Sequence, residues 1–186
     1  LSLKALMLAQ EIHEVKKDSE RIYAGLSKII TIERSDTYAL SDLLRMITKS
    51  NARYSEYLQK DIHFEVIFNE DFETKEHILL LAMLNNIVAN AIEVIETKGF
   101  IKLEVTTTPN VITFTIENNG PCIPENVLPV IFDPGYTTKF NENGIASTGI
   151  GLSHVQTIAY RLEGTITVSS NETTIFTITI PTYKLR

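Results

Sequence analysis

Residues 131–156, IFDPGYTTKFNENGIASTGIGLSHVQ, hold the most informative pattern in the chain. An aromatic turn is followed by small and polar residues, and the stretch closes on Gly149 and Gly151, where an apolar-periodic helical segment begins. Backbone N–H groups point outward at a helix start and the helix dipole favours negative charge, so a phosphate could bind here. Further donors could come from Thr137, Thr138, Lys139, Ser147 and Thr148. A glycine pair before a helix is equally often a tight turn with close packing, so this stretch alone leaves both interpretations open.

The composition is that of an ordinary globular protein, and the length fits one sizeable domain or one domain plus a short appendage. The formal charge of -6 argues against a nucleic-acid-binding module, which needs a basic face. The single cysteine, Cys122, excludes an internal disulfide and fits a reducing compartment. No run looks long and apolar enough to span a bilayer, and no signal peptide is visible. Because the chain starts at Leu1 rather than methionine, we expect a fragment whose membrane or sensor region could lie upstream.

Two N-terminal segments have the periodicity of helices. Residues 3–32 carry apolar residues at three- to four-residue spacing and a charged opposite face, which predicts a long helix that packs on a partner helix or a second copy. Residues 37–60 predict a second helix, with Asp36 or Ser41 as its N-cap. Its expected inner face consists of Leu40, Leu43, Leu44, Ile47 and Tyr54. The pattern changes near Asp61, so we expect a helical domain over residues 1–60 and a second domain over residues 61–186.

The second domain mixes helices and strands. The expected strands are residues 63–68, 101–106, 111–116, 165–169 and 174–180. The expected helices are residues 73–96 and 151–162, with a short helix from Pro124 to near Ile131. The late strands come as adjacent pairs, which favours the α+β class, with an antiparallel or mixed sheet that carries helices on one face.

The apolar segment LNNIVANAIEVI at residues 84–95 carries polar residues on one side. Asn86 and Asn90 are four residues apart and share a helix face, and Glu93 follows on the same side. Buried asparagine is costly unless it is hydrogen-bonded, and its amide oxygen is a suitable hard ligand for magnesium. The alternative is an internal hydrogen-bond pair or a helix–helix contact.

The segment NNGPCIP at residues 118–124 directly follows an expected strand. Side-chain amides at a strand end, beside a glycine turn, can offer hydrogen bonds to the edge of a flat ligand. Taken alone, the segment is better explained as a β-turn.

These segments occur in an order that resembles the GHKL ATP-binding domain. NIVANA at residues 86–91 resembles its N box, and ENNGPCIP at 117–124 its G1 box. IFDPGYTTK at 131–139 is similar to the F box, and TGIGL at 148–152 to the G2 box. The spacing also resembles that of bacterial sensor histidine kinases, and the resemblance covers about residues 62–181.

The resemblance implies ATP and Mg²⁺ as ligands. Asn90 would coordinate the magnesium and Asn86 would support the phosphate side. Asn118 would face the adenine amino group, Gly120 would let the base approach the backbone, and Thr174 would complete the adenine edge. Residues 136–148 would form a mobile lid, and the glycines of the G2 box would direct N–H groups to the phosphates. The complete expected set is Asn86, Asn90, Asn118, Gly120, Ile123, Tyr136, Thr137, Thr138, Lys139, Thr148, Gly149, Ile150, Gly151, Leu152 and Thr174.

Three positions depart from the family pattern. Asn118 stands where the G1 box normally has aspartate, so the hydrogen bond to adenine lacks the assistance of a charge and should be weaker. Cys122 replaces the usual second glycine, and Glu93 stands where many histidine kinases have a basic residue. An acid at that position resembles the branch with citrate and dicarboxylate sensors. ATP binding is expected to be retained in a weaker form.

The residue at position 86 separates two reaction types. GHKL enzymes that hydrolyse ATP have a glutamate one helical turn before the magnesium asparagine, and this chain has Asn86 there. An amide cannot accept a proton as a general base, so we expect phosphoryl transfer to a residue with little hydrolysis.

The candidate phosphoacceptor is His13, followed by Glu14. The carboxylate could accept one ring proton and leave the other nitrogen to attack the γ-phosphate. The segment resembles the H box of histidine kinases, although Asp18 replaces a common proline and Lys17 stands where kinases with phosphatase activity have threonine or asparagine. Alternatively, residues 3–32 form the second helix of a longer hairpin whose phosphoacceptor lies upstream.

The resemblance as a whole predicts the cytoplasmic fragment of a sensor histidine kinase. A helical hairpin would pair with a second chain into a four-helix bundle, followed by a GHKL-type α/β sandwich with a mixed sheet. The phosphoryl group would pass to an aspartate of a response regulator, nucleic acid would not be a partner, and the full-length protein could be anchored in the bacterial membrane. One alternative is a serine kinase like the anti-sigma factors, and another is a degenerate module that binds a partner without kinase activity.

Overall fold

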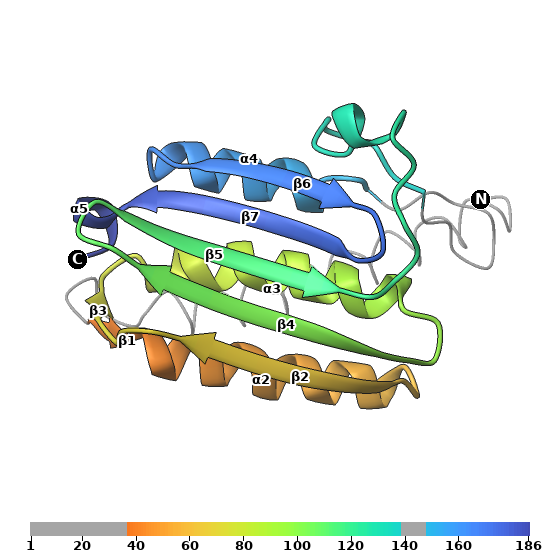
Figure 1. Ribbon diagram of the computed structural model, residues 1–186, viewed down its shortest axis with the longest axis horizontal. Coiled ribbons are helices and arrows are strands. Elements are labelled where there is room, and N and C mark those ends of the chain that lie inside the picture. Colours follow the sequence, from red (N-terminus) through yellow and green to blue (C-terminus); the bar gives the residue numbers. More distant parts are fainter. Residues whose placement is uncertain (1–36, 139–147) are drawn as a thin grey trace, which may run out of the picture. The chain divides into compact units, whose positions relative to one another are not determined.

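The computed structural model describes residues 37–138 and 148–186 (Figure 1). His13 and Glu14 lie outside the described residues, as do Lys139 and Ser147. The chain divides into two compact units between Asp36 and Thr37. The unit Thr37–Arg186 contains the described residues.

A five-stranded mixed sheet forms the centre of this unit, in the order β2-β4-β5-β7-β6. The strands are β2 (Asp61–Phe68), β4 (Lys98–Thr107), β5 (Val111–Asn118), β6 (Thr165–Ser170) and β7 (Thr174–Pro181). The β2–β4 pair is parallel and the other pairs are antiparallel, which confirms the expected mixed sheet. A separate two-stranded ribbon pairs β1 (Tyr38–Ala39) with β3 (Glu73–Thr74).

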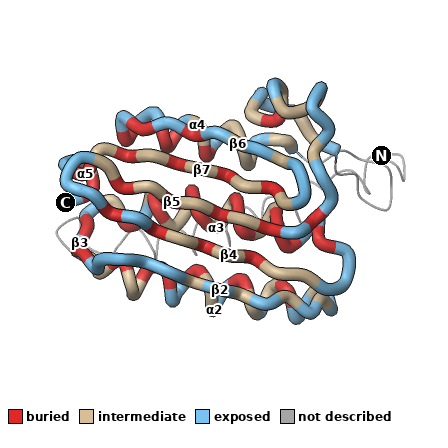
Figure 2. Tube along the Cα trace, in the orientation of Figure 1, coloured by how far each residue is buried: buried red, intermediate tan, exposed pale blue. Residues whose placement is uncertain are grey.

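Three helices lie behind the sheet in Figure 1: α2 (Leu40–Tyr57), α3 (His77–Val94) and α4 (Gly151–Arg161). The 3₁₀ turn η1 (Leu128–Val130) and α5 (Thr182–Leu185) complete the described elements. Strands β5 and β7 alternate buried with half-buried residues (Figure 2), because one face of the sheet carries the core. Many of their half-buried residues are threonines. Helix α3 packs against both α2 and α4 and is the central helix of the layer.

Helix α2 belongs to this unit, which corrects the boundary expected near Asp61. Its side chains Leu40, Leu43, Leu44 and Ile47 are at most 2% exposed and lie in the same core as α3 and the sheet. Beyond the helix end, the Lys60 ammonium donates to the carbonyls of Ile92 and Glu93 at 2.8 Å each. The expected inner face of α2 is therefore confirmed, and within the described unit it packs against α3.

The start of α2 is capped from another part of the chain. The N-cap position is Ala39 and not the expected Ser41, which is itself a donor, and Asp36 lies outside the described residues. The Ser41 backbone N–H and hydroxyl donate to the Asp71 carboxylate at 2.9 and 2.6 Å. The bond from the hydroxyl, and then the bond from the backbone N–H, lowers the pKa of Asp71 below its usual value. The loop between β2 and β3 thus supplies the capping carboxylate.

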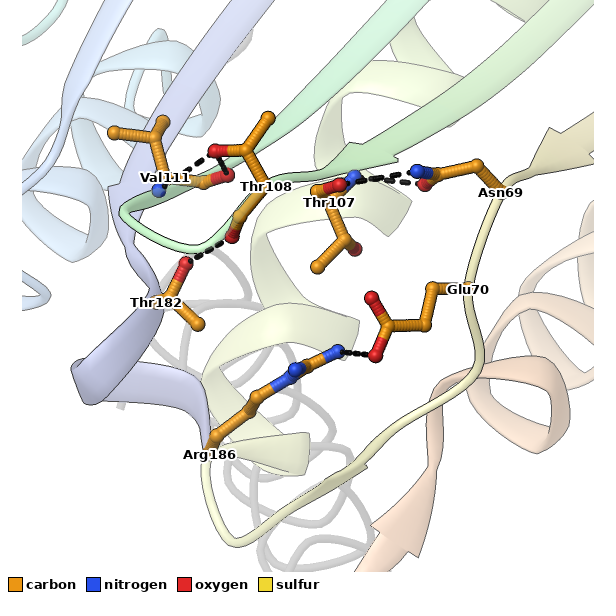
Figure 3. Close-up of polar contacts among 7 residues, drawn as sticks. All are labelled: Asn69, Glu70, Thr107, Thr108, Val111, Thr182 and Arg186. Atoms are coloured by element: carbon orange, nitrogen blue, oxygen red, sulfur yellow. Dashed lines mark hydrogen bonds and ion pairs between the residues drawn. The ribbon is translucent and has the colours of Figure 1, made fainter.

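Polar contacts fasten the end of the sheet opposite Asn118 (Figure 3). The Asn69 side chain donates to the Thr107 carbonyl at 3.0 Å and accepts from the Thr107 N–H at 2.7 Å, and so extends the β2–β4 pairing. The Thr182 hydroxyl donates to the Thr108 carbonyl at 2.9 Å, and Arg186 forms an ion pair with Glu70. These contacts therefore stabilise one end of the sheet, whereas a cavity forms at the other end.

Among the described residues, α3 is the one helix long and apolar enough to cross a membrane by length and composition, which the sequence analysis did not expect. Its apolar side chains Leu80, Leu84 and Ile87 are 0% exposed, so the same composition is explained by a central position in the core.

Candidate functional site

A cavity of about 630 Å³ opens at the end of the sheet where β5 ends and β7 begins. This volume is within the range of small-molecule sites. Its lining comes from α3, the loop after β5, the turn at residues 131–138, the start of α4 and β7. The sequence-predicted residues that line it are Asn90, Asn118, Ile123, Tyr136, Thr137, Thr138, Thr148, Gly149, Ile150, Gly151, Leu152 and Thr174. Asn86 and Gly120 do not line the cavity but contact residues that do.

One end of the cavity is built on paired strands. Asn118 on β5 lies opposite Thr174 on β7, and the two side chains are 2% and 3% exposed. The Asn118 Oδ1 accepts from the Gly120 N–H at 3.0 Å, and Nδ2 donates to the Thr174 carbonyl at 3.4 Å. The amide is therefore held by one backbone donor, the Gly120 N–H, and one backbone acceptor, the Thr174 carbonyl.

Ser170 on β6 supports this end and was not predicted from the sequence. Its hydroxyl lies 2.6 Å from the Thr174 hydroxyl and accepts from the Ile123 N–H at 2.8 Å. Ser170 thus joins β7 to the loop after β5. The available signal was its place opposite Thr174 in the β6–β7 hairpin, but the bond to Ile123 joins segments far apart in the sequence.

Gly120 is required by packing. A Cβ at this position would lie 2.8 Å from the Val94 side chain and 2.9 Å from Asn118 Oδ1. The glycine therefore lets the loop lie against α3 while its N–H fixes the Asn118 amide.

The other end of the cavity is formed by the first turn of α4 facing α3. A Cβ on Gly151 would lie 3.4 Å from Asn86 Oδ1 and 3.9 Å from Asn90 Nδ2, which is ordinary van der Waals contact, so the helix start lies close to both amides. The Asn86 Nδ2 donates to the Ala82 carbonyl of its own helix at 2.7 Å. Among the described residues, the N-cap residue Ile150 makes no side-chain capping bond, and the N–H groups and dipole at the start of α4 favour an anion in the cavity.

The glycines at 135 and 149 bring the two ends of the glycine-rich segment together. Gly135 donates its N–H to the Gly149 carbonyl at 3.1 Å. Gly149 has φ +61, and a Cβ there would lie 2.5 Å from the Gly135 carbonyl carbon. No other residue type fits without moving the backbone, so a glycine at this position allows the close approach of Gly149 to Gly135.

Two side chains in the lining of the cavity carry reactive groups, the carboxylate of Glu93 and the thiol of Cys122. Glu93 lines it, and the Tyr54 hydroxyl on α2 donates to Glu93 Oε1 at 2.9 Å. Burial, and then this bond, raises the pKa of Tyr54. Cys122 also lines the cavity, and its thiol donates to the Asn171 carbonyl. Within residues 37–138 and 148–186, no group of three or more His, Cys, Asp or Glu side chains could hold a metal ion.

A mixed sheet covered by helices on one face, with a cavity between a buried amide and a glycine-rich helix start, is typical of a nucleotide-binding α/β sandwich. The comparisons with known proteins give the family. Residues 75–184 match the family model described as "Histidine kinase-, DNA gyrase B-, and HSP90-like ATPase". The chain belongs to this family, and its domain is an ATP-binding domain.

Individual relatives agree with this assignment. The chain is 42% identical over 185 residues to Sensor histidine kinase GlnK of Bacillus subtilis, across 97% of this chain and 45% of that protein. It is 28% identical over 120 residues to Sensor protein CitS of Halalkalibacterium halodurans, across 61% of this chain and 22% of that protein. The chain thus spans less than half the length of these curated relatives.

A solved structure shows the same fold. The catalytic domain of histidine kinase ThkA is 25% identical, with a TM-score of 0.65, and the match covers 78% of this chain and 97% of that domain. The sequence resemblance to bacterial sensor histidine kinases is therefore confirmed, as is the expected α/β sandwich with a mixed sheet.

Proposed function

We propose that this chain is the catalytic segment of a sensor histidine kinase, which binds Mg-ATP and transfers the γ-phosphoryl group to a histidine. The observation that carries the proposal is that one cavity collects residues from all four boxes, which lie between positions 86 and 152 of the sequence. In the complete protein, the phosphoryl group would pass on to an aspartate of a response regulator. This segment would lie on the cytoplasmic side of a membrane-anchored protein.

Adenine would lie at the strand-built end, against Asn118 and Thr174, and the phosphates would lie at the start of α4. Asn90 would offer its amide oxygen to Mg²⁺, with the remaining ligands from phosphate oxygens and water. Bound Mg²⁺ would neutralise charge that develops on the phosphates. Gly149 and Gly151 suit this arrangement, because both line the cavity at the start of a helix, where backbone N–H groups can bind phosphate.

Transfer would be favoured over hydrolysis. Asn86 is the residue one helical turn before Asn90, and its Nδ2 is bonded to its own helix at 2.7 Å. An amide cannot remove a proton from water, so this position supplies no general base. Positioning and electrostatic stabilisation would therefore do most of the catalysis, with the acceptor held in line with the γ-phosphate.

The proposed acceptor is His13, with Glu14 as the partner that takes its ring proton. Residues 3–32 would join a second copy of the chain in a helical bundle. A hairpin between residues 3–32 and 37–60 would have to remove Leu40 and Leu44 from the core, where they are 0% and 2% exposed. We therefore propose that the bundle is built without α2.

The test is autophosphorylation with γ-labelled Mg-ATP, in which the chain is compared with His13→Gln and with His63→Gln as a matched control. His63 is an exposed residue of β2 and should not matter. We expect acid-labile label that is lost only in His13→Gln. Acid-labile label that persists in His13→Gln would overturn that residue as the acceptor, and acid-stable label would favour the serine kinase. If the chain neither became labelled nor bound ADP, it would be better described as a degenerate module that binds a partner without kinase activity.

A further inference from the structure

Glu93 is the one acidic side chain among the described residues that line the cavity, and its place on α3 lies between the two ends of the site. At one end, a Cβ on Gly151 would lie 3.9 Å from the Asn90 amide. At the other end, a Cβ on Gly120 would lie 2.8 Å from the Val94 side chain. Glu93 follows Asn90 by three residues, about 4.5 Å along the helix axis, and directly precedes Val94.

Two contacts hold the end of α3 that carries Glu93. The Tyr54 hydroxyl donates to Glu93 Oε1 at 2.9 Å, and the Lys60 ammonium donates to the backbone carbonyls of Ile92 and Glu93 at 2.8 Å each. A carboxylate can accept up to about four hydrogen bonds, so it can serve Tyr54 and further hydroxyl donors at the same time. The carboxylate therefore has a defined place in the wall between the two ends of the cavity.

We infer that Glu93 binds the ribose of the nucleotide by accepting hydrogen bonds from its 2′- and 3′-hydroxyl groups. This inference rests on the proposed function, in which adenine lies against Asn118 and the phosphates lie at the start of α4, because the ribose then lies between them. Two neighbouring hydroxyl groups are donors that one carboxylate can accept together, as acids do with ribose in dinucleotide-binding folds. Glu93 is then a specificity-determining residue that contacts the sugar and favours ribonucleotides over deoxyribonucleotides.

The negative charge of Glu93 favours the sugar over the phosphates as its partner. A carboxylate and a phosphate repel each other unless a cation lies between them. The ribose is uncharged, and its hydroxyl groups form stronger hydrogen bonds to an ionised acceptor than to a neutral one. The competing partner of the carboxylate is the Mg²⁺ of the nucleotide, so the experiment must separate the sugar from the metal.

The experiment measures the affinity of the full chain for ADP, 2′-deoxy-ADP and 3′-deoxy-ADP by calorimetric titration with Mg²⁺. We expect the loss of either hydroxyl to weaken binding about fivefold, since each loss removes one hydrogen bond to the carboxylate. In Glu93→Ala, both affinity ratios should fall to near one. Glu96→Ala is the matched control, because Glu96 is exposed near the same helix end and lies outside the lining, and it should leave both ratios unchanged.

A titration at several Mg²⁺ concentrations separates the sugar from the metal. We expect the dependence of ADP affinity on Mg²⁺ to be the same in Glu93→Ala as in the unmodified chain. A dependence that is lost in the variant would place the carboxylate on the metal and overturn the inference.

Equal affinity of the unmodified chain for the three nucleotides would overturn the inference and leave the proposed function standing. So would ratios that persist in Glu93→Ala. Failure of the unmodified chain to bind ADP at all would overturn the proposed function, and the inference with it. The decisive ratios are measured on the unmodified chain, so the test does not depend on the folding of the variant.

Discussion

Helices α2 and α3 lie side by side, both are 18 residues long, and both bury leucine and isoleucine in one core, but only α3 lines the cavity. Helix α2 is amphipathic, and its contribution is to cover α3 and the sheet. Helix α3 is apolar on most sides and places asparagines where α2 and α4 meet it. The difference shows that burial alone does not mark a functional helix, whereas polar residues in an apolar helix mark the points where it meets something other than core.

The asparagines of α3 give the sharpest test of this comparison. Asn90 lines the cavity, whereas Asn85 accepts from Asn51 of α2 at 2.8 Å. We expect Asn90→Ala to lower autophosphorylation by about a hundredfold, because it removes a group proposed to position Mg-ATP. The urea concentration at the unfolding midpoint of Asn90→Ala should differ little from that of the unmodified chain. Asn85→Ala is the matched control, and it should lower stability without weakening nucleotide binding. If Asn90→Ala lowered only stability and Asn85→Ala weakened nucleotide binding, the assignment of Asn90 to the cavity and of Asn85 to the contact with α2 would be wrong.

A core substitution in α2 should lower stability and leave nucleotide binding unchanged. Leu44 is 2% exposed, and Leu44→Ala should lower the free energy of unfolding of the catalytic unit by about 2–5 kcal/mol, through lost burial and a cavity. The affinity of the folded fraction for ADP should stay unchanged. The measurement is urea unfolding followed by ADP titration at low temperature. If the unit unfolded at the same urea concentration as the unmodified chain, α2 would not belong to it.

The cap of α2 should show a smaller effect that depends on pH. Asp71→Ala should cost about 1 kcal/mol, the usual value of an N-cap. The pKa of Asp71 is lowered in the fold from its usual 3.8, so its contribution is present above about pH 4 and is lost as pH falls through the folded value. Asp71→Asn is the control, because it can still cap but does not titrate. Comparison of the three unfolding curves at pH 3 and pH 7 checks this, and an acid-sensitive difference in the Asn variant would contradict it.

The hydrogen bond that joins the two helices should matter least. Tyr54→Phe removes the 2.9 Å bond to Glu93 and should lower stability by about 0.5–1 kcal/mol. Because Glu93 lines the cavity, ADP affinity should be measured as well, and we expect a change of less than about twofold. A large loss of affinity would mean that α2 controls the site through Tyr54, and the distinction between the helices would then fail.

Much of the fold could be predicted from sequence patterns. The alternation of β-branched residues predicted β5 and β7, and the run of apolar residues before Gly99 predicted α3. The family resemblance predicted which residues would meet, and twelve of them line one cavity. The carboxylate of Asp71 and the hydroxyl of Ser170 were missed, because each acts on a partner about 30 or more residues away, Ser41 in one case and Ile123 in the other.

The sequence by itself determined the longer helices and strands, the family and the types of residue at the site, because spacing along a helix or strand is a local property. Only the tertiary structure decided that α2 belongs to the catalytic unit and that the Asn118 amide points Oδ1 towards Gly120. An apolar stripe requires burial but does not specify the covering surface, and a side-chain amide has no preferred orientation until its neighbours are in place. Both outcomes depend on contacts between distant segments, and these exist only once the chain has folded.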